Sequence, residues 1–224
     1  MIAKKYFFFL AALGEIIALL FDIELLHQIC KPLLVLTLLI YFWDRSEAQK
    51  GDKWVFHVTL ALAFSWVADI MLLFTDKNFL FFFAGLAGFL VAHVFYILAY
   101  WKATFHGRIK FGFSFIPLII IGYAVLMGFL IIPYTDGVIQ IPVALYTTVI
   151  SIMLIFAWYR KGQTTRASFQ WVFGGAILFV ISDSILAINR FSETIPFAGL
   201  LVMVTYISAQ WLIVNGLLKY ESTV

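Results

Sequence analysis

Two aspartates lie inside long apolar segments, and their type and position favour acid–base chemistry. Asp69 ends the string SWVAD at 65–69, and Asp183 ends the string ISD at 181–183. A charge at the centre of a bilayer costs from about 3 kcal/mol upward, so an ionisable group in an apolar segment is a functional candidate. When two carboxyl groups share one buried site, one can serve as a general acid and the other as a base. The pair therefore predicts proton transfer to and from a substrate.

The depth of the two aspartates within their segments supports this hypothesis. Asp69 stands about 15 residues, and Asp183 about 14 residues, after the start of its apolar run. Both are therefore expected slightly beyond the middle of a bilayer, at one depth, where they could converge on one polar pocket. The alternative is that each aspartate is a strut between helices, hydrogen-bonded locally to Ser65 or Ser182.

Two further pairs of polar residues follow the aspartates along the chain. His93 and Tyr96 are spaced i, i+3, and Tyr206 and Gln210 are spaced i, i+4. Each pair therefore occupies one face of a helix. We interpret them as the wall of a pocket that orients a substrate. The alternative is ordinary packing, with each buried polar group satisfied by a neighbour.

Other chemistry finds less support in the sequence. Lys31 and Pro32 begin an apolar run, where the lysine could meet a phosphate or simply reach the interface ahead of a helix-starting proline. Glu15 interrupts the first apolar run, and the sequence indicates no role for it.

A metal site formed by the aspartates and His93 is a weak alternative, because no second histidine stands at the spacing that metal ligands have on a helix. The single cysteine, Cys30, excludes an intrachain disulfide, and no G-x-S-x-G motif occurs.

The elements that position these residues are apolar helices. Of 224 residues, 64% are hydrophobic and 12% are charged, and the mean hydropathy is +1.02. A soluble domain usually has about twice that charged fraction. Most of the apolar runs reach the roughly 20 residues that cross the hydrocarbon, which predicts an all-α polytopic membrane protein with eight transmembrane helices. The predicted spans are residues 6–23, 30–43, 54–74, 79–101, 111–132, 138–159, 169–189 and 195–218.

The cations alternate between the gaps, which predicts that both termini are cytoplasmic. Twelve of the 15 lie on the side of the termini: Lys4, Lys5, Arg45, Lys50, Lys53, Lys102, Arg108, Lys110, Arg160, Lys161, Arg166 and Lys219. The other side holds Lys31, Lys77 and Arg190. Because the gaps are short and the first run has no cleavage site, we expect a single integral membrane domain over 1–224 with a retained first span.

A weak internal repeat relates the two halves of the chain. Asp69 and Asp183 are 114 residues apart, and the same offset aligns the triplet AGL at 84–86 with AGL at 198–200. Four spans in each half would make a parallel repeat of 1–110 and 111–224. The glycines at 85, 88, 174 and 175 are interpreted as positions where helices pack closely.

Several of these strings are typical of one family. They are KPL at 31–33, SWVAD at 65–69, AH…Y at 92–96, Tyr146, GAILF…SD at 175–183 and Y…AQ at 206–210. On these residues the chain resembles the YhhN-like membrane family, known as lysoplasmalogenases, over almost its whole length. Ala68 stands where that family often has glycine.

The resemblance implies hydrolysis of the vinyl ether bond of a lysoplasmalogen to a fatty aldehyde and a glycerophospho-head group. Asp69 and Asp183 are then the acid–base pair, without a metal or cofactor. Substrate binding is expected from Lys31, His93, Tyr96, Tyr146, Ser182, Tyr206 and Gln210. The expected partners are the lysophospholipid substrate and membrane lipids. Nucleic acid is not expected, because the cations lie between apolar segments.

Other functions remain open on the residues alone. Paired carboxylates in a membrane also serve proton-coupled transporters, and the aspartates of a non-catalytic lipid-binding membrane protein could simply hold helices together. A different lipid hydrolase, acting on an ester or amide, is a further alternative. The short loops and the absence of an ER-retention signal favour a bacterial cytoplasmic membrane.

Overall fold

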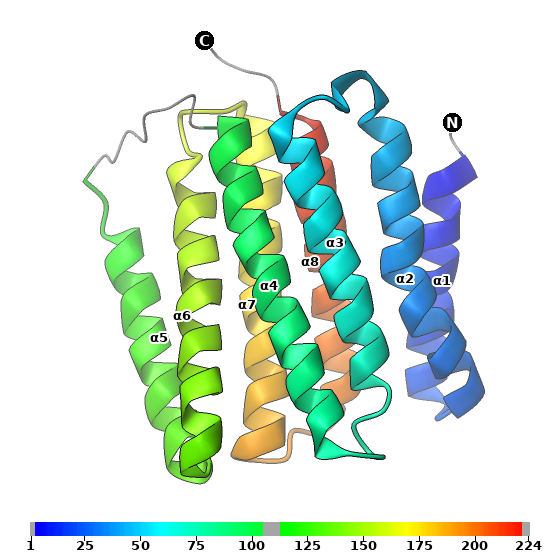
Figure 1. Cartoon of the computed structure of the whole chain (residues 1–224), viewed down its shortest axis with the longest axis vertical. Helices are drawn as coiled ribbons and strands as arrows, with labels where there is room; N and C mark the ends of the chain where they lie inside the picture. Colours follow the sequence, from blue (N-terminus) through cyan, green and yellow to red (C-terminus); the bar gives the residue numbers. More distant parts are fainter. Residues whose placement is uncertain (1–2, 105–112, 221–224) are drawn as a thin grey trace. The chain divides into compact units, whose positions relative to one another are not determined.

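The described part of the chain is helical throughout. The computed structural model describes residues 3–104 and 113–220, and these form eight α-helices and two short 3₁₀ helices with no strand (Figure 1). The α-helices are α1 (Ala3–Leu20), α2 (Glu24–Arg45), α3 (Lys53–Leu72), α4 (Phe79–Thr104), α5 (Ile116–Ile131), α6 (Gly137–Tyr159), α7 (Arg166–Phe191) and α8 (Ala198–Leu218). The 3₁₀ helices are η1 (Glu47–Gln49) and η2 (Ile132–Tyr134).

Seven helical segments, α2 to α8 with α5 taken together with η2, are long and apolar enough to cross a membrane. The helix α1 falls outside that group because its 18 residues include Lys4, Lys5 and Glu15. The all-α architecture predicted from the apolar runs is therefore confirmed in the described residues. The cations Arg108 and Lys110, counted above for orientation, lie outside them.

The second helix begins earlier than the sequence predicted. The helix α2 starts at Glu24, so Pro32 lies inside it and not at its first turn. The polar residues at 27 and 28 hid this beginning, because a search for apolar runs passes over them. Gln28 Nε2 donates to Glu24 Oε1 over 2.9 Å and supports the first turn. At Pro32 the helix lacks one N–H donor, which would otherwise bond to the carbonyl of Gln28.

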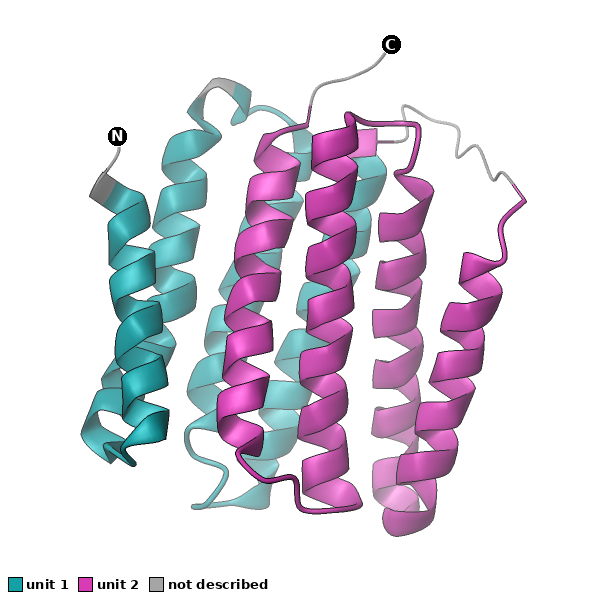
Figure 2. Ribbon diagram, turned by 180° about the vertical axis from the view of Figure 1, so that it is seen from behind, with its two compact units in different colours: residues 1–102 teal, residues 103–224 magenta. Residues whose placement is uncertain are grey.

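The chain forms two compact units (Figure 2). Unit 1 comprises residues 1–102, and within it α2 packs against both α1 and α3. Unit 2 comprises residues 103–224, where α6 packs against α5 and α7, and α7 packs extensively against α8. The predicted repeat boundary, between 110 and 111, lies outside the described residues.

Glycines bring two helix pairs into close contact. A Cβ added to Gly85 of α4 would lie 2.6 Å from Leu72 Cδ2 of α3, and one on Gly88 would lie 2.9 Å from Ala68 Cβ. In unit 2, a Cβ on Gly175 of α7 would lie 2.9 Å from the Ala209 carbonyl oxygen of α8. These three predicted packing positions are confirmed. Gly174 is not one of them, because a Cβ there would meet nothing within 4 Å.

A buried arginine joins the helix ends of unit 2. The side chain of Arg160, at the end of α6, is fully buried and donates to Thr104 Oγ1 of α4 and, over 2.8 Å, to Ser168 Oγ of α7. The Ser168 hydroxyl donates in turn to the Gly216 carbonyl of α8 over 2.7 Å. The sequence placed Arg160 among the loop cations, but its side chain is buried, and the hydroxyl groups of Thr104 and Ser168 accept its hydrogen bonds.

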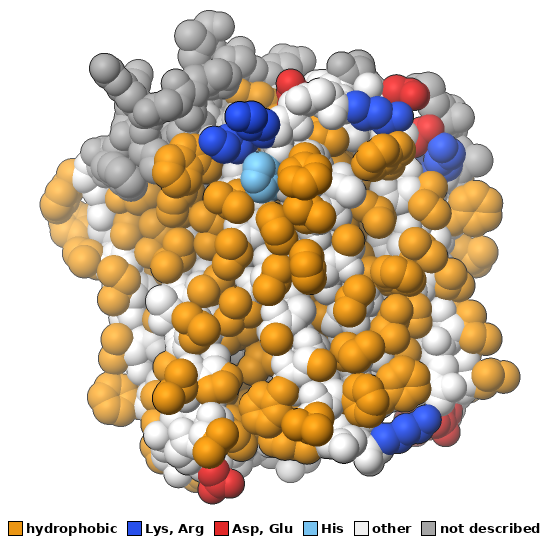
Figure 3. All heavy atoms as spheres, viewed as in Figure 1, with side chains coloured by type: hydrophobic (Ala, Val, Ile, Leu, Met, Phe, Trp, Pro, Cys, Tyr) orange, Lys and Arg blue, Asp and Glu red, His pale blue; other side chains and the backbone are white. Residues whose placement is uncertain are grey.

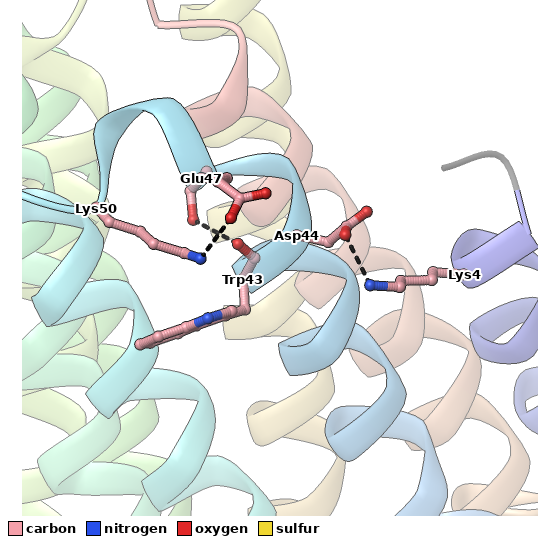
Figure 4. Close-up of polar contacts among 6 residues, drawn as sticks. Lys4, Trp43, Asp44, Glu47 and Lys50 are labelled. Carbon is pink, nitrogen blue, oxygen red and sulfur yellow. Dashed lines mark hydrogen bonds and ion pairs between the residues drawn. The ribbon is translucent and has the colours of Figure 1, made fainter.

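On one face of the molecule, the charged side chains at the surface lie near the ends of the helices (Figure 3). On the face drawn in Figure 3, hydrophobic side chains cover the middle of the helices, and the lysines, arginines and acidic residues lie near the helix ends. One such cluster, at the end of α2, is drawn in Figure 4: Lys4 Nζ lies 2.6 Å from Asp44 Oδ1, and Lys50 Nζ lies 3.1 Å from Glu47 Oε1. Lys50 also lies 5.4 Å from the centre of the Trp43 ring.

Candidate functional site

Asp183 is held by a tyrosine of the neighbouring helix. The helices α6 and α7 pack side by side, and the Tyr146 hydroxyl on α6 donates to Asp183 Oδ2 on α7. Tyr146 is buried and Asp183 is half-buried. A phenol that donates to a carboxylate fixes the direction of that carboxylate. The sequence predicted both residues for the site but gave no contact between them.

The residue that follows Asp183 on α7 makes a contact with a second tyrosine, which the sequence did not predict. The Tyr123 hydroxyl on α5 bonds to Ser184 Oγ, and the Ser184 hydroxyl donates to the Val180 carbonyl on its own helix. Because the single hydroxyl hydrogen of Ser184 goes to Val180, Tyr123 is the donor in the first bond. A lone tyrosine in an apolar run gave no signal for this contact, since its partner is 61 residues away in the sequence.

The predicted pair on α8 is confirmed as a local contact. Gln210 Nε2 donates to the Tyr206 hydroxyl over 3.2 Å, as the i, i+4 spacing allows. The Tyr206 ring packs edge-on against Phe179 of α7, with the ring centres 5.4 Å apart. The Ser182 hydroxyl donates to the Val202 carbonyl of α8 over 3.0 Å, so it joins α7 to α8 and is not the partner of Asp183 suggested by the strut interpretation.

In unit 1, Asp69 lies in a buried polar environment on α3. The Asp69 side chain is 2% exposed, and Ser65, one turn before it, is completely buried. Ser65 Oγ and Trp66 Nε1 have no hydrogen-bond partner among the residues that the structure describes. A buried donor without a partner costs about 1–3 kcal/mol, so such groups call for a water or a ligand. The structure does not give Ser65 the role of local partner to Asp69.

The polar pair on α4 is also buried. His93 and Tyr96 are both completely buried, and the Tyr96 ring stacks on Tyr100 with the ring centres 6.2 Å apart. Lys31 is half-exposed and stands two turns after the start of α2. No three His, Cys, Asp or Glu side chains within 3–104 and 113–220 are grouped so that they could hold a metal ion.

Glu15 has a partner that the sequence did not reveal. Its carboxylate is completely buried, and Oε1 lies 2.8 Å from His27 Nδ1. This contact joins α1 to α2, two helices that pack together in unit 1. The i, i+3 and i, i+4 spacings within a helix could not predict this contact, because the two residues lie on different helices, 12 positions apart.

The predicted site residues therefore divide between the units. Lys31, Asp69, His93 and Tyr96 belong to unit 1, and Tyr146, Ser182, Asp183, Tyr206 and Gln210 belong to unit 2. Within unit 2 the structure brings Tyr146 to Asp183 and Tyr206 to Gln210.

Comparisons with known proteins agree with one another. The YhhN family model matches residues 26–217. Lysoplasmalogenase TMEM86B of Rattus norvegicus is 29% identical over 190 residues, which cover 85% of this chain and 71% of the relative. Lysoplasmalogenase TMEM86B of Homo sapiens is 32% identical over 164 residues, which cover 71% of this chain and 62% of the relative. Lysoplasmalogenase TMEM86A of Homo sapiens is 29% identical over 162 residues, which cover 70% of this chain and 62% of the relative. No solved structure matches the chain significantly.

Proposed function

Because this chain belongs to the YhhN family, we propose that it is a lysoplasmalogenase, which hydrolyses the vinyl ether bond of a lysoplasmalogen. The names of its relatives supply the substrate class. The observation that carries the proposal is the Asp183 carboxyl group, held by the Tyr146 hydroxyl within an apolar helix pair. An ionisable group in such surroundings is costly, and such groups in membrane proteins usually mark functional sites.

The reaction needs an acid and a base. A proton added to the β-carbon of the vinyl ether leaves a cation shared by the α-carbon and the ether oxygen, as in glycoside hydrolysis. Water adds to the α-carbon and loses a proton, and the resulting hemiacetal collapses to a fatty aldehyde and the free glycerol hydroxyl. We assign Asp69 and Asp183 to the two proton transfers, in an order left open.

The remaining residues orient the substrate in this proposal. Tyr146 directs the Asp183 carboxylate, and Ser65 offers a buried hydroxyl one turn from Asp69. Lys31 attracts the phosphate of the head group. The other proposed binding residues are His93, Tyr96, Ser182, Tyr206 and Gln210.

The proposed topology has eight spans and two cytoplasmic termini in a single membrane domain. It adds α1 to the seven helices that are long and apolar enough to cross, because Lys4 and Lys5 stand at its first turn, where lysines reach the interface. The cluster of Trp43, Lys4 and Lys50 at the end of α2 has the composition of a cytoplasmic interface. The parallel repeat and a bacterial cytoplasmic membrane are parts of the same proposal.

The test is aldehyde release by the purified protein. An alkenyl lysophospholipid is supplied beside its ester-linked analogue, to wild type and to the Asp69→Asn and Asp183→Asn variants. We expect aldehyde from the vinyl ether alone, and a loss of about 10²–10⁴-fold in kcat for each variant, which is the usual contribution of a general acid or base. Asp136→Asn, an exposed position just before α6, is the matched control and should keep wild-type activity.

Three outcomes would contradict the proposal. Full turnover by either folded aspartate variant would remove that residue from the mechanism. Cleavage of the ester analogue alone would indicate a different lipid hydrolase. Proton-dependent uptake of a solute by vesicles that contain the protein, without any release of aldehyde, would favour the proton-coupled transporter.

A further inference from the structure

A serine one turn before Asp69 differs from other hydroxyl groups in the helices. Thr37, Thr59 and Thr147 each donate to the carbonyl four residues earlier, over 2.7, 2.9 and 2.9 Å. Ser65 Oγ makes no such bond and has no other partner among the residues that the structure describes, although Ser65 is completely buried. Buried hydroxyl groups are nearly always bonded, so this exception calls for a small polar molecule.

A second donor on the same turn also lacks a partner. Trp66 Nε1 is buried and bonds to nothing within the described parts of the chain. An indole N–H can only donate, and it has one fixed direction, so it cannot turn to the backbone of the preceding turn as a hydroxyl can. This turn of α3 therefore offers a hydroxyl and an N–H group to the same kind of molecule.

The side chain of Asp69 covers this turn. In an α-helix the Cα–Cβ bonds tilt towards the N-terminus, so a side chain lies over the turn before its own residue. Ser65 and Trp66 stand four and three residues before Asp69, which are the two spacings that make side chains neighbours on a helix surface. Because Asp69 is only 2% exposed, the hydroxyl, indole and carboxyl groups are neighbours at one buried place.

The backbone of α4 closes this turn on one side. A Cβ on Gly88 of α4 would lie 2.9 Å from Ala68 Cβ and 3.4 Å from the Phe64 carbonyl oxygen. Phe64 and Ala68 stand on either side of Ser65 and Trp66 in the sequence. The close approach of the two helices keeps lipid chains away from the turn on that side.

We propose that Ser65 and Trp66 hold, beside Asp69, the water that attacks the substrate. This inference rests on the proposed function for the reaction. The water donates one hydrogen to Asp69 and the other to Ser65 Oγ, and it accepts from Trp66 Nε1, which makes up the about three hydrogen bonds of a typical buried water. The hydroxyl hydrogen of Ser65 turns to the preceding turn of the helix. One lone pair of the water remains for the substrate.

This water gives the two aspartates separate tasks. After the β-carbon of the vinyl ether has taken a proton, a lone pair of the water oxygen forms the new bond to the α-carbon. One hydrogen of the water passes to the Asp69 carboxylate, and the electron pair of the broken O–H bond stays on the oxygen of the hemiacetal. Asp69 is therefore the base, and Asp183 supplies the first proton. Ser65 and Trp66 are positioning residues, because they orient the water and exchange no proton with the substrate.

Competition between water and methanol tests the site. Methanol that attacks the same cation gives a mixed acetal, which keeps the glycerophospho-head group, in place of the aldehyde. The ratio of acetal to aldehyde is set after the cation forms, so it reports on the water site whichever step limits the rate. Ser65→Ala removes one bond to the water and makes room for a methyl group, so we expect the ratio to rise about tenfold. A wild-type ratio in Ser65→Ala would overturn the inference.

Two variants serve as controls for this ratio. Ser151 of α6 is also buried and has no partner in the described residues, but no aspartate follows it three or four residues later. Ser151→Ala should therefore keep the wild-type ratio. Tyr146→Phe acts on Asp183, so it should slow the reaction and leave the ratio unchanged. A rise in either control as large as that in Ser65→Ala would mean that Ser65 does not hold the water, and would overturn the inference.

Thermal unfolding separates this inference from the proposed function, because it needs no activity. If the Ser65 hydroxyl bonds to a water at Asp69, Ser65→Ala loses a hydrogen bond, and its Tm should fall by about 2–4 °C. If that hydroxyl has no partner, alanine removes an unsatisfied polar group, and Tm stays the same or rises. Ser151→Ala should show no fall.

The two measurements together distinguish the possible failures. An unchanged or higher Tm in Ser65→Ala would overturn the water site even if the wild type releases aldehyde. A fall in Tm for Ser65→Ala alone, in a protein that releases no aldehyde, would support the water site and refute the proposed function.

Discussion

The hydrogen bond between Tyr146 and Asp183 gives a sharp prediction for catalysis. Tyr146→Phe removes one hydroxyl group and leaves the packing of the ring unchanged. A hydrogen bond to a charged group contributes about 1.5–3 kcal/mol. If the bond directs the carboxylate in the transition state, its loss lowers kcat/KM by about 10- to 160-fold, at 1.36 kcal/mol per tenfold. The assay is aldehyde release from an alkenyl lysophospholipid, with circular dichroism and thermal unfolding in detergent to check the fold.

A matched tyrosine provides the control. Tyr123→Phe also breaks a bond from a tyrosine to α7, but the partner is the neutral Ser184 next to Asp183. Hydrogen bonds between membrane helices contribute about 0.6 kcal/mol on average and up to about 1.7 kcal/mol, so both variants should lose similar stability. Only Tyr146→Phe should lose substantial activity. Wild-type kcat/KM in Tyr146→Phe, or an equal loss in both variants, would refute the positioning role of Tyr146.

Two further predictions concern stability, and thermal unfolding measures both. Gly175→Ala should destabilise by about 1–3 kcal/mol, because its Cβ would lie 2.9 Å from a backbone oxygen of α8. Gly174→Ala, which meets nothing within 4 Å, should be neutral or stabilise by up to about 1 kcal/mol. Arg160→Leu should cost about 2 kcal/mol, because two hydrogen bonds between membrane helices, at about 0.6–1.7 kcal/mol each, are lost, and lower Tm by roughly 4–8 °C. Lys161→Leu, an exposed neighbour, should change stability by less than about 0.5 kcal/mol.

These predictions have clear contrary outcomes. Equal stability of the two alanine variants would mean that α7 and α8 are farther apart than the glycine contact requires. A Tm for Arg160→Leu equal to that of Lys161→Leu would mean that the guanidinium is solvated and does not join the helix ends.

The sequence revealed the helices because membrane spans leave a one-dimensional signal. An apolar run of about 20 residues has few alternatives to a helix in lipid, where every backbone group must bond within its own segment. The beginning of α2 was missed for the same reason. Its first two turns carry Glu24, His27 and Gln28, and a hydropathy pattern cannot distinguish a polar helix end from a loop.

The sequence also indicated candidate site residues by their rarity. Asp69 and Asp183 were conspicuous because carboxylates in apolar segments are costly. Tyr206 and Gln210 were paired correctly because a helix brings i and i+4 together whatever surrounds it. Their local geometry needed no tertiary information.

Contacts between helices were decided only by the tertiary structure. Tyr146 bonds to Asp183 across 37 residues, Glu15 of α1 lies beside His27 of α2, and Arg160 turns inward to bond to Thr104. Each depends on the rotation of two helices about their axes, which is set by side-chain packing along their whole length. By itself the sequence determined which residues could do chemistry. The packing decided which partner each one meets, because a contact across helices has no spacing in the sequence that could indicate it.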